Sequence, residues 1–284
     1  MTTKRGNTEN STDYFRENGL PTKQQLRDLN AALPPGGLPP AEPASEPVPP
    51  EPIDTVRRKI ECLREFILPE RYESLTQRLD LRMRYMVLCL EDIYYPHNAS
   101  AVVRSAEAFG IQELHAVEHT VRFAPNKHIV RGTDQWLDIR KWRDTPSLAG
   151  HLRERGYRIV ATAPPRAGRP DGGDGEGNFT PSDFDVAAGP FAIFMGTEKS
   201  GVSDWLLAEA DAVVSIPMAG FAESLNISVS AAIVAQRLTE RVREPAGGID
   251  WRLPAEDRDR LLCRWLCHSV RDWRQILVRS GLEP

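Results

Sequence analysis

The sequence predicts an α/β fold built on a parallel sheet with helices on both faces. Short continuous apolar runs, such as residues 85–90 and 191–195, are typical of strands buried on both sides. Helical patterns separate these runs, as they do between the strands of a parallel sheet. The chain of 284 residues is 40% hydrophobic and 27% charged, which fits a globular domain with polar extensions.

The elements follow in order along the chain. The apolar runs predict strands at residues 85–90, 114–117, 137–142, 157–162, 191–195 and 212–216. The expected helices are residues 99–109, 147–155, 203–209, 224–243 and 255–278, the first two ending at Gly110 and Gly156. The acidic, glycine-rich residues 168–178 are expected to form a loop.

Four segments divide the chain. Residues 1–54 hold nine prolines between positions 34 and 52, a composition that favours a flexible tail, with a docking segment as the alternative and a short helix at 23–32. Residues 55–84 are a helical, partly arginine-rich extension, because Ile60, Leu63 and Ile67 recur at helical spacing. Residues 85–243 are the α/β domain, and residues 244–284 are a C-terminal helical extension.

Composition excludes several classes of protein. The net charge of −4 argues against coating nucleic acid non-specifically, although it allows a local basic patch. The sequence has no apolar run near the roughly 20 residues of a membrane span and no secretory signal at its start. Cys263 and Cys267 share a helix face, so a disulfide or metal pair is conceivable, but buried free thiols in a reducing cytoplasm explain the four cysteines better.

The general motifs of catalytic and nucleotide-binding sites match little of this sequence. We find no phosphate-loop signature, no zinc-ligand spacing and no nucleophile-elbow serine. Residues 172–177 lack the order of a dinucleotide-binding motif, and their acidic side chains would repel a pyrophosphate.

Two clusters of polar residues follow predicted strands, where open α/β sheets bind ligands. Asn98 is placed to cap the next helix, and Arg104 lies about 600° further around that helix among small residues. In the second cluster, Gly196 and Gly201 flank Glu198 directly after the strand at 191–195. A capping asparagine with a surface arginine, and a plain strand-to-helix turn, are the alternative explanations.

The third cluster follows the strand at 212–216. Ser224 is placed to cap the helix at 224–243, and Asn226 adds hydrogen-bonding capacity that one cap does not require. Free backbone N–H groups at a helix start favour polar ligands.

Together, the three clusters resemble the three signature motifs of the SpoU–TrmH family of RNA ribose methyltransferases, in the family's order. The resemblance covers roughly residues 71–243, and the segments at 94–98 and 132–137 are similar to the branch that methylates a D-loop guanosine of tRNA. Ile227 and Ser230 depart from the family's usual valine and alanine, and the proline-rich N-terminus lies outside the pattern. The resemblance implies a C-terminal trefoil knot and a homodimer.

The resemblance also implies S-adenosylmethionine as cofactor and transfer of its methyl group to a ribose 2'-OH. The implied cofactor-binding residues are Thr162, Gly196, Ile216, Met218 and Leu225. Arg104 is the implied catalytic arginine, and Asn98, Glu198, Ser224 and Asn226 would orient it and the ribose. A guanidinium keeps its proton to about pH 12, so we expect it to clamp a phosphate and stabilise the developing alkoxide instead of acting as a base.

RNA contacts are expected from a local basic patch. Residues 120–143 carry six Arg or Lys against two acids, a net of +4. The first candidates for phosphate contacts are Arg122, Lys127, His128 and Arg131. The C-terminal helix interleaves arginines with Trp265 and Trp273, which predicts either an RNA-stacking surface or tryptophans packed on the core or on a dimer partner.

A tRNA is therefore the expected substrate, and no metal or membrane is expected. Ribosomal RNA is the alternative substrate for the same chemistry. A non-catalytic RNA-binding module and a dinucleotide-dependent oxidoreductase are the alternatives from other classes.

Overall fold

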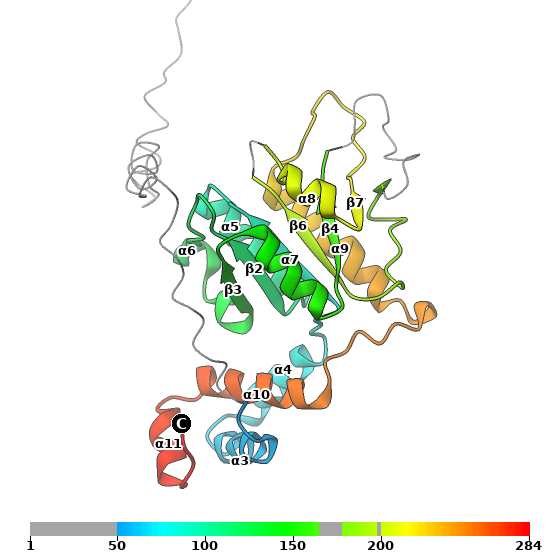
Figure 1. Cartoon of the computed structure of the whole chain (residues 1–284). Helices are drawn as coiled ribbons and strands as arrows, with labels where there is room; N and C mark the ends of the chain where they lie inside the picture. Colours follow the sequence, from blue (N-terminus) through cyan, green and yellow to red (C-terminus); the bar gives the residue numbers. More distant parts are fainter. Residues whose placement is uncertain (1–49, 165–177, 198–199) are drawn as a thin grey trace, which may run out of the picture.

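The computed structural model describes residues 50–164, 178–197 and 200–284 (Figure 1). Most of the proline-rich segment, the helix expected at 23–32, nearly all of the acidic loop and Glu198 lie outside the described residues. Within the described ranges, no helix is long and apolar enough to cross a membrane.

A seven-stranded sheet forms the centre of the molecule, and all of its paired strands are parallel, as predicted. Its order is β3-β2-β1-β6-β4-β7-β5. The strands are β1 (Met86–Glu91), β2 (Glu113–Val117), β3 (Asp138–Trp142), β4 (Arg158–Thr162), β5 (Asn178–Phe179), β6 (Phe191–Met195) and β7 (Ala212–Val214). The short β5 was not predicted, and β7 ends at Val214, two residues earlier than predicted.

Helices cover both faces of this sheet, as Figure 1 shows. They are α5 (Pro96–Ala108), α6 (Lys127–Val130), α7 (Thr145–Glu154), α8 (Asp204–Glu209) and α9 (Ile227–Arg243), with 3-10 turns η1 (Thr133–Trp136) and η2 (Pro245–Gly247). Met86, Leu88 and Leu90 of β1 pack in one core with α5 and α9. Val87 and Cys89 face the opposite way and pack with α7 and α8, so the alternation of side chains along β1 serves two cores.

Four helices from the two ends of the described chain pack together, and we call them the helical cap. They are α3 (Ile53–Arg64), α4 (Pro69–Leu79), α10 (Ala255–Ser269) and α11 (Trp273–Arg279). They share one hydrophobic cluster, which lies below the sheet in Figure 1, at the amino end of β1. The single helix predicted at 255–278 is wrong, because Asp272 adopts a left-handed conformation with φ of 56° and separates α10 from α11.

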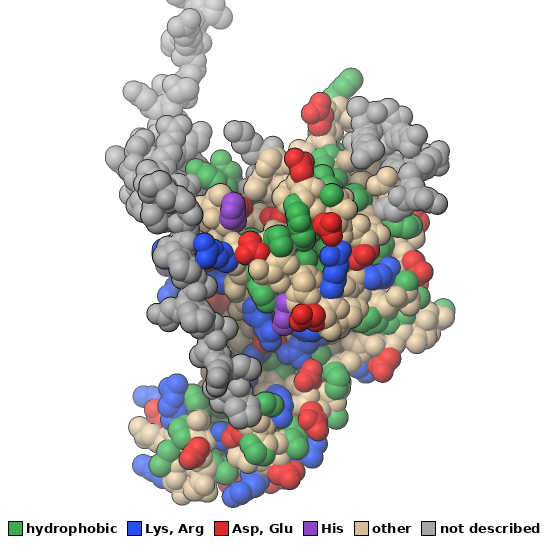
Figure 2. Space-filling view, viewed as in Figure 1, with side chains coloured by type: hydrophobic (Ala, Val, Ile, Leu, Met, Phe, Trp, Pro, Cys, Tyr) green, Lys and Arg blue, Asp and Glu red, His purple; other side chains and the backbone are tan. Residues whose placement is uncertain are grey.

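Trp265 of α10 decides between the two interpretations of the C-terminal tryptophans. Its side chain is 1% exposed, packs edge-on against Trp136 at 5.4 Å between ring centroids, and lies 5.1 Å from the guanidinium of Arg82. Trp265 is therefore a packing residue of the helical cap and not part of an RNA-stacking surface. Cys263 is likewise buried and free, as expected. Figure 2 shows Lys and Arg side chains interspersed with Asp and Glu over the helical cap.

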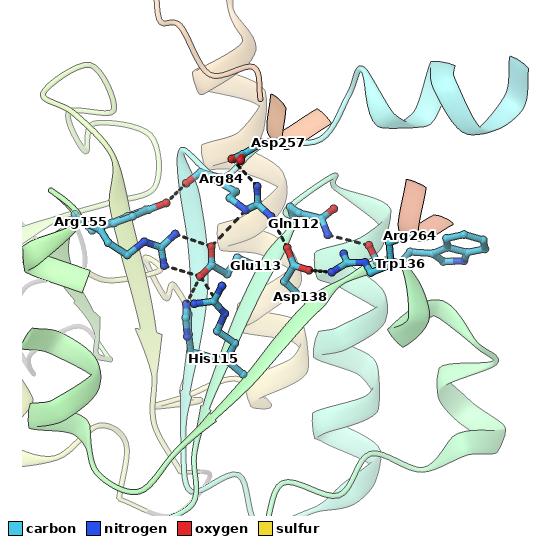
Figure 3. Close-up of polar contacts among 11 residues, drawn as sticks. Arg84, Gln112, Glu113, His115, Trp136, Asp138, Arg155, Asp257 and Arg264 are labelled. Atoms are coloured by element: carbon cyan, nitrogen blue, oxygen red, sulfur yellow. Dashed lines mark hydrogen bonds and ion pairs between the residues drawn. The ribbon is translucent and has the colours of Figure 1, made fainter. Parts of the chain in front are cut away.

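A polar network joins the helical cap to the amino ends of β2 and β3 (Figure 3). Arg84 donates to Asp138 at 2.6 Å and to Asp257 of α10 at 2.8 Å. Arg264 of α10 also pairs with Asp138. These ion pairs join residues of the helical cap to residues of the sheet, so they help to fix the position of the cap relative to the sheet.

Glu113 is the buried anion of this network, with its side chain 1% exposed. Arg155 donates to both of its carboxylate oxygens, at 2.6 and 2.8 Å. Trp142 Nε1 donates to His115 Nδ1 at 2.9 Å, which places the imidazole proton on Nε2, 3.1 Å from Glu113 Oε1. Burial alone would raise the pKa of Glu113, but hydrogen bonds and attraction from Arg155 and His115 outweigh burial and lower that pKa well below its usual range.

We predict that this carboxylate makes folding sensitive to acid. Because its pKa is depressed in the folded state, Glu113 stabilises the protein above its unfolded pKa of about 4.5, and this contribution is lost as pH falls below that value. Glu113→Gln should lower the free energy of unfolding at pH 7 by about 3 kcal/mol, since it leaves Arg155 without its buried partner.

Urea denaturation of the wild type and the variant at pH 7, 5 and 3.5 checks this. The difference between the two proteins should shrink at the lowest pH. A constant difference across the three values would contradict the role given to Glu113.

Candidate active site

The carboxyl ends of β1, β6, β4 and β7 lie side by side at the edge of the sheet away from the helical cap. Each of these strands leads into a segment that carries residues from the sequence analysis. Since the paired strands are parallel, these segments converge on one edge, where open α/β sheets bind ligands.

The segment after β6 is held by contacts between its own backbone atoms. Thr197 N donates to Gly201 O at 2.9 Å, and Gly201 N donates to Thr197 O at 3.1 Å. A Cβ built on Gly196 would lie 1.9 Å from the carbonyl carbon of Gly201, so only glycine allows this approach. Gly201 itself has φ of 72°, a conformation that glycine adopts without strain.

The segment after β7 leads through residues 215–226 into α9. The helix begins at Ile227 and its N-cap is Asn226, whose side chain accepts hydrogen bonds from Ser228 N at 2.9 Å and Ser228 Oγ at 2.6 Å. The prediction that Ser224 caps this helix is therefore wrong. Ser224 lies exposed in the preceding loop, where its side chain is open to a ligand.

Asn98 and Asn226 meet, although 128 positions separate them in the sequence. Asn226 Nδ2 donates to Asn98 Oδ1 at 3.2 Å. The predicted capping role of Asn98 is wrong, because α5 begins at Pro96 after the N-cap Tyr95 and encloses Asn98 in its first turn. At 2% exposed, Asn98 instead fixes the start of α9 against α5.

Arg104 lies on the exposed side of α5. Its guanidinium donates to the carbonyl oxygen of Ile129 in α6 at 3.1 Å. Asn126 caps α6 through its side chain, and its own N–H donates to Ser100 Oγ of α5 at 2.7 Å. The hydrogen bond to Ser100 therefore fixes α6, and with it the Ile129 carbonyl, against α5. This carbonyl orients Arg104 through one N–H group of the guanidinium, and the other N–H groups can contact a ligand.

The five predicted cofactor-binding residues come from adjacent strand ends. Thr162 Oγ1 donates to Phe194 O at 2.9 Å, which ties β4 to β6 near Gly196. Ile216 and Met218 are half-buried, and Leu225 is 37% exposed. Together these three present an apolar surface at the sheet edge.

A purine nucleoside fits this surface. Among the described residues, no backbone–backbone hydrogen bond is formed by positions 216–225. Backbone groups of this loop could therefore bond to polar atoms of a ligand, although Pro217 has no N–H to offer, and the apolar side chains suit a ring. In the described ranges, no cluster of three or more His, Cys, Asp or Glu side chains could hold a metal.

The four candidate RNA-binding residues lie in and around α6. Arg122, Lys127, His128 and Arg131 are all exposed, and Arg131 takes a left-handed conformation with φ of 51° after α6. Part of the remaining basic charge of residues 120–143 is paired, since Lys141 Nζ lies 2.6 Å from Glu118. The exposed Lys127 and His128 belong to α6, the helix whose Ile129 carbonyl binds Arg104.

Two contributors to this site were not predicted from the sequence. The carbonyl of Ile129 carries no sequence signal, because any residue supplies one. Glu91 does carry a signal, since it is an acid at the end of an apolar strand, and it is only 6% exposed in the structure. Glu198 lies outside the described residues, so its predicted role is not placed by the structure.

This chain is similar to known proteins in both sequence and fold. The sequence model of the SpoU rRNA Methylase family matches residues 85–236. A tRNA (guanosine(18)-2'-O)-methyltransferase of Borreliella burgdorferi is 33% identical over 227 residues, covering 78% of this chain and 96% of the relative. One of the same name from Thermus thermophilus is 36% identical over 202 residues, covering 69% and 98%.

A solved structure shows the same fold. The Aquifex aeolicus TrmH/SpoU tRNA modifying enzyme superposes with a TM-score of 0.60 at 25% identity, covering 71% of this chain and 97% of that one. The match spans over half of this chain and nearly the full length of these relatives. The chain belongs to the SpoU rRNA Methylase family.

Proposed function

We propose that this protein methylates the ribose 2'-OH of a guanosine in tRNA, with S-adenosylmethionine as the methyl donor. The observation that carries the proposal is the hydrogen bond from Asn226 at the start of α9 to Asn98, which lies on the same helix as Arg104, at the edge where the three sequence motifs converge. The curated relatives named above act on guanosine 18, a D-loop position, so we propose this nucleotide. Ribosomal RNA is the alternative substrate.

S-adenosylmethionine supplies a methyl group on a sulfonium, which is a good leaving group. The chain's own residues must then bind, orient and stabilise charge. Thr162, Gly196, Ile216, Met218 and Leu225 would hold the cofactor through backbone groups and an apolar surface. Exposed cations of the α6 segment, with Lys127 and Arg131 among them, would contact RNA phosphates.

Arg104 would act on the ribose and its adjacent phosphate. A guanidinium offers two N–H groups in one plane to a phosphate and stabilises an alkoxide as it forms. Asn98 and Asn226 would position the start of α9 against the helix of Arg104, and Ser224 would contact the ribose from the preceding loop. Glu198 is proposed to orient Arg104 by resemblance alone.

Two further features of the family are proposed for this chain. In the sheet, β7 lies between β4 and β5, which are consecutive in the sequence. The chain after β7 thus leaves the sheet between the two ends of the β4–β5 connection, an order that supports a trefoil knot. A tRNA substrate also supports a cytoplasmic location.

A homodimer is the second feature. Val229 and Ile233 are 45% and 39% exposed and lie four residues apart on α9. They share one helix face, and a second copy of the chain would cover it.

We predict that Arg104→Ala lowers the turnover number for methyl transfer to a tRNA transcript by about 100-fold or more, the effect of removing one group that stabilises developing negative charge. Arg104→Lys should also be impaired, because an ammonium cannot contact a phosphate in two places. Steady-state assays with labelled S-adenosylmethionine measure both variants. Arg153→Ala, which removes an exposed arginine of α7, is the control, and full activity of Arg104→Lys would contradict this role.

We predict that Gly196→Ala raises the Kd for S-adenosylmethionine at least about tenfold, because the added Cβ forces Gly201 and Val202 to move. Gly150→Ala in α7 is the matched control, since its Cβ meets nothing within 4 Å. Titration calorimetry measures both. An unchanged Kd in Gly196→Ala would remove this segment from the cofactor site.

We predict that Ile233→Glu converts the dimer to a monomer, because it places a charge in an apolar interface. Light scattering on a sizing column reports the mass. Val278→Glu alters an equally apolar side chain, 61% exposed on α11, and should leave the dimer intact. A dimeric Ile233→Glu protein would place the interface elsewhere.

A further inference from the structure

Glu91 is a buried acid that the proposed function has not yet used. It is the last residue of β1 and is 6% exposed. Its Oε2 accepts a hydrogen bond from Ser203 N at 2.8 Å, and its Oε1 accepts one from Ser203 Oγ at 2.9 Å. Oε1 also accepts from the hydroxyl of Thr145.

No Lys or Arg of the described chain forms an ion pair with this carboxylate. Burial of an acid is costly unless hydrogen bonds compensate for lost water, so all three donors are needed. An apolar residue would fill this place at the end of an apolar strand with less cost. A specific task for the three hydrogen bonds explains the acid better than packing does.

Ser203 connects Glu91 to the segment after β6. It is the N-cap of α8 and follows Gly201 and Val202 directly. The backbones of those two residues are the atoms that a Cβ on Gly196 would strike, and Gly201 is bridged to Thr197. Through Ser203, Glu91 therefore holds the far end of the same short segment whose near end is Gly196.

Thr145 lies on the other side of the carboxylate. It is the first residue of α7, is 8% exposed, and belongs to an element that does not carry any of the proposed cofactor-binding residues. Loss of the hydrogen bond from Thr145 should therefore affect the packing of α7, whereas loss of the bonds from Ser203 should affect the segment after β6. Because both residues donate to the same carboxylate, substitutions of Thr145 and Ser203 form a matched pair.

We propose that Glu91 is a positioning residue for S-adenosylmethionine binding, which it promotes by fixing Ser203 and, through it, Gly201 against Gly196. This inference rests on the proposed function for the identity of the ligand. Glu91 itself is set behind the segment and does not touch the cofactor. Removal of the Glu91 side chain should weaken cofactor binding, because Ser203 and Gly201 would then be less well fixed in the protein without cofactor.

Glu91→Ala, Ser203→Ala and Thr145→Val test this proposal in the full-length protein. The measurements are the Kd for S-adenosylmethionine, the melting temperature, and amide hydrogen exchange at residues 200–206 without cofactor. We expect Glu91→Ala and Ser203→Ala to raise the Kd about tenfold or more and to speed exchange, since hydrogen bonds to a charged group are lost. Thr145→Val should lower the melting temperature yet keep the Kd within about twofold of wild type.

Glu91→Gln is the conservative rescue. Its amide oxygen can accept from Ser203 N, and its NH₂ group can donate to the two hydroxyl oxygens, so it should retain most of the affinity that Glu91→Ala loses. This recovery separates the hydrogen-bonding role from a requirement for bulk alone.

The outcomes separate this inference from the proposed function. Wild-type protein that binds S-adenosylmethionine, with the Kd unchanged in Glu91→Ala and Ser203→Ala, would overturn the inference alone. An equal rise of Kd in Thr145→Val would also overturn it, because general destabilisation would then suffice. Wild-type protein that does not bind S-adenosylmethionine would overturn the proposed function, and exchange at residues 200–206 would still show whether Glu91 holds Ser203.

Discussion

The parallel direction of the strands is the constraint on which the rest of the structure depends. It gathers the carboxyl ends of β1, β6, β4 and β7 at one edge and the amino ends at the other. The first edge carries the loop at 216–225, which forms no backbone–backbone hydrogen bond among the described residues, and the second carries the charge network of Glu113 and Asp138. The proposed active site and the charge network that joins the helical cap to the sheet therefore lie at opposite ends of one sheet, and a change in the helical cap need not disturb the proposed cofactor loops.

The two edges use buried carboxylates differently. Glu113 forms an ion pair with Arg155 and contacts His115, which together lower the pKa of Glu113, and it contributes to the joint between cap and sheet. Glu91 is satisfied by hydroxyls and one backbone N–H, which fixes local geometry without an ion pair. The first arrangement stabilises the contact between the helical cap and the sheet. The second suits a segment whose backbone must be placed accurately for a ligand.

Much of the fold could be predicted from the sequence because apolar strand runs and helix stops are local signals. The run at Phe191–Met195 was placed at its true bounds, and parallel pairing followed from the alternation of strands and helices. The break at Asp272 could not be predicted, because the apolar spacing continues through it while Leu277 packs back into the helical cap. The predicted cap at Asn98 is wrong because its partner Asn226 is 128 positions away in the sequence, and the predicted cap at Ser224 is wrong because α9 begins later, after Asn226. The orienting carbonyl of Ile129 has no signature in any side chain.

The central claim is that this edge of the sheet methylates a specific ribose in tRNA. The most direct test is to incubate the wild-type protein with labelled S-adenosylmethionine and an unmodified tRNA transcript, and then to map the labelled nucleotide by digestion and mass spectrometry. We predict a single 2'-O-methylguanosine at position 18 of the D-loop. Label on a base, or no label on the tRNA, would contradict it.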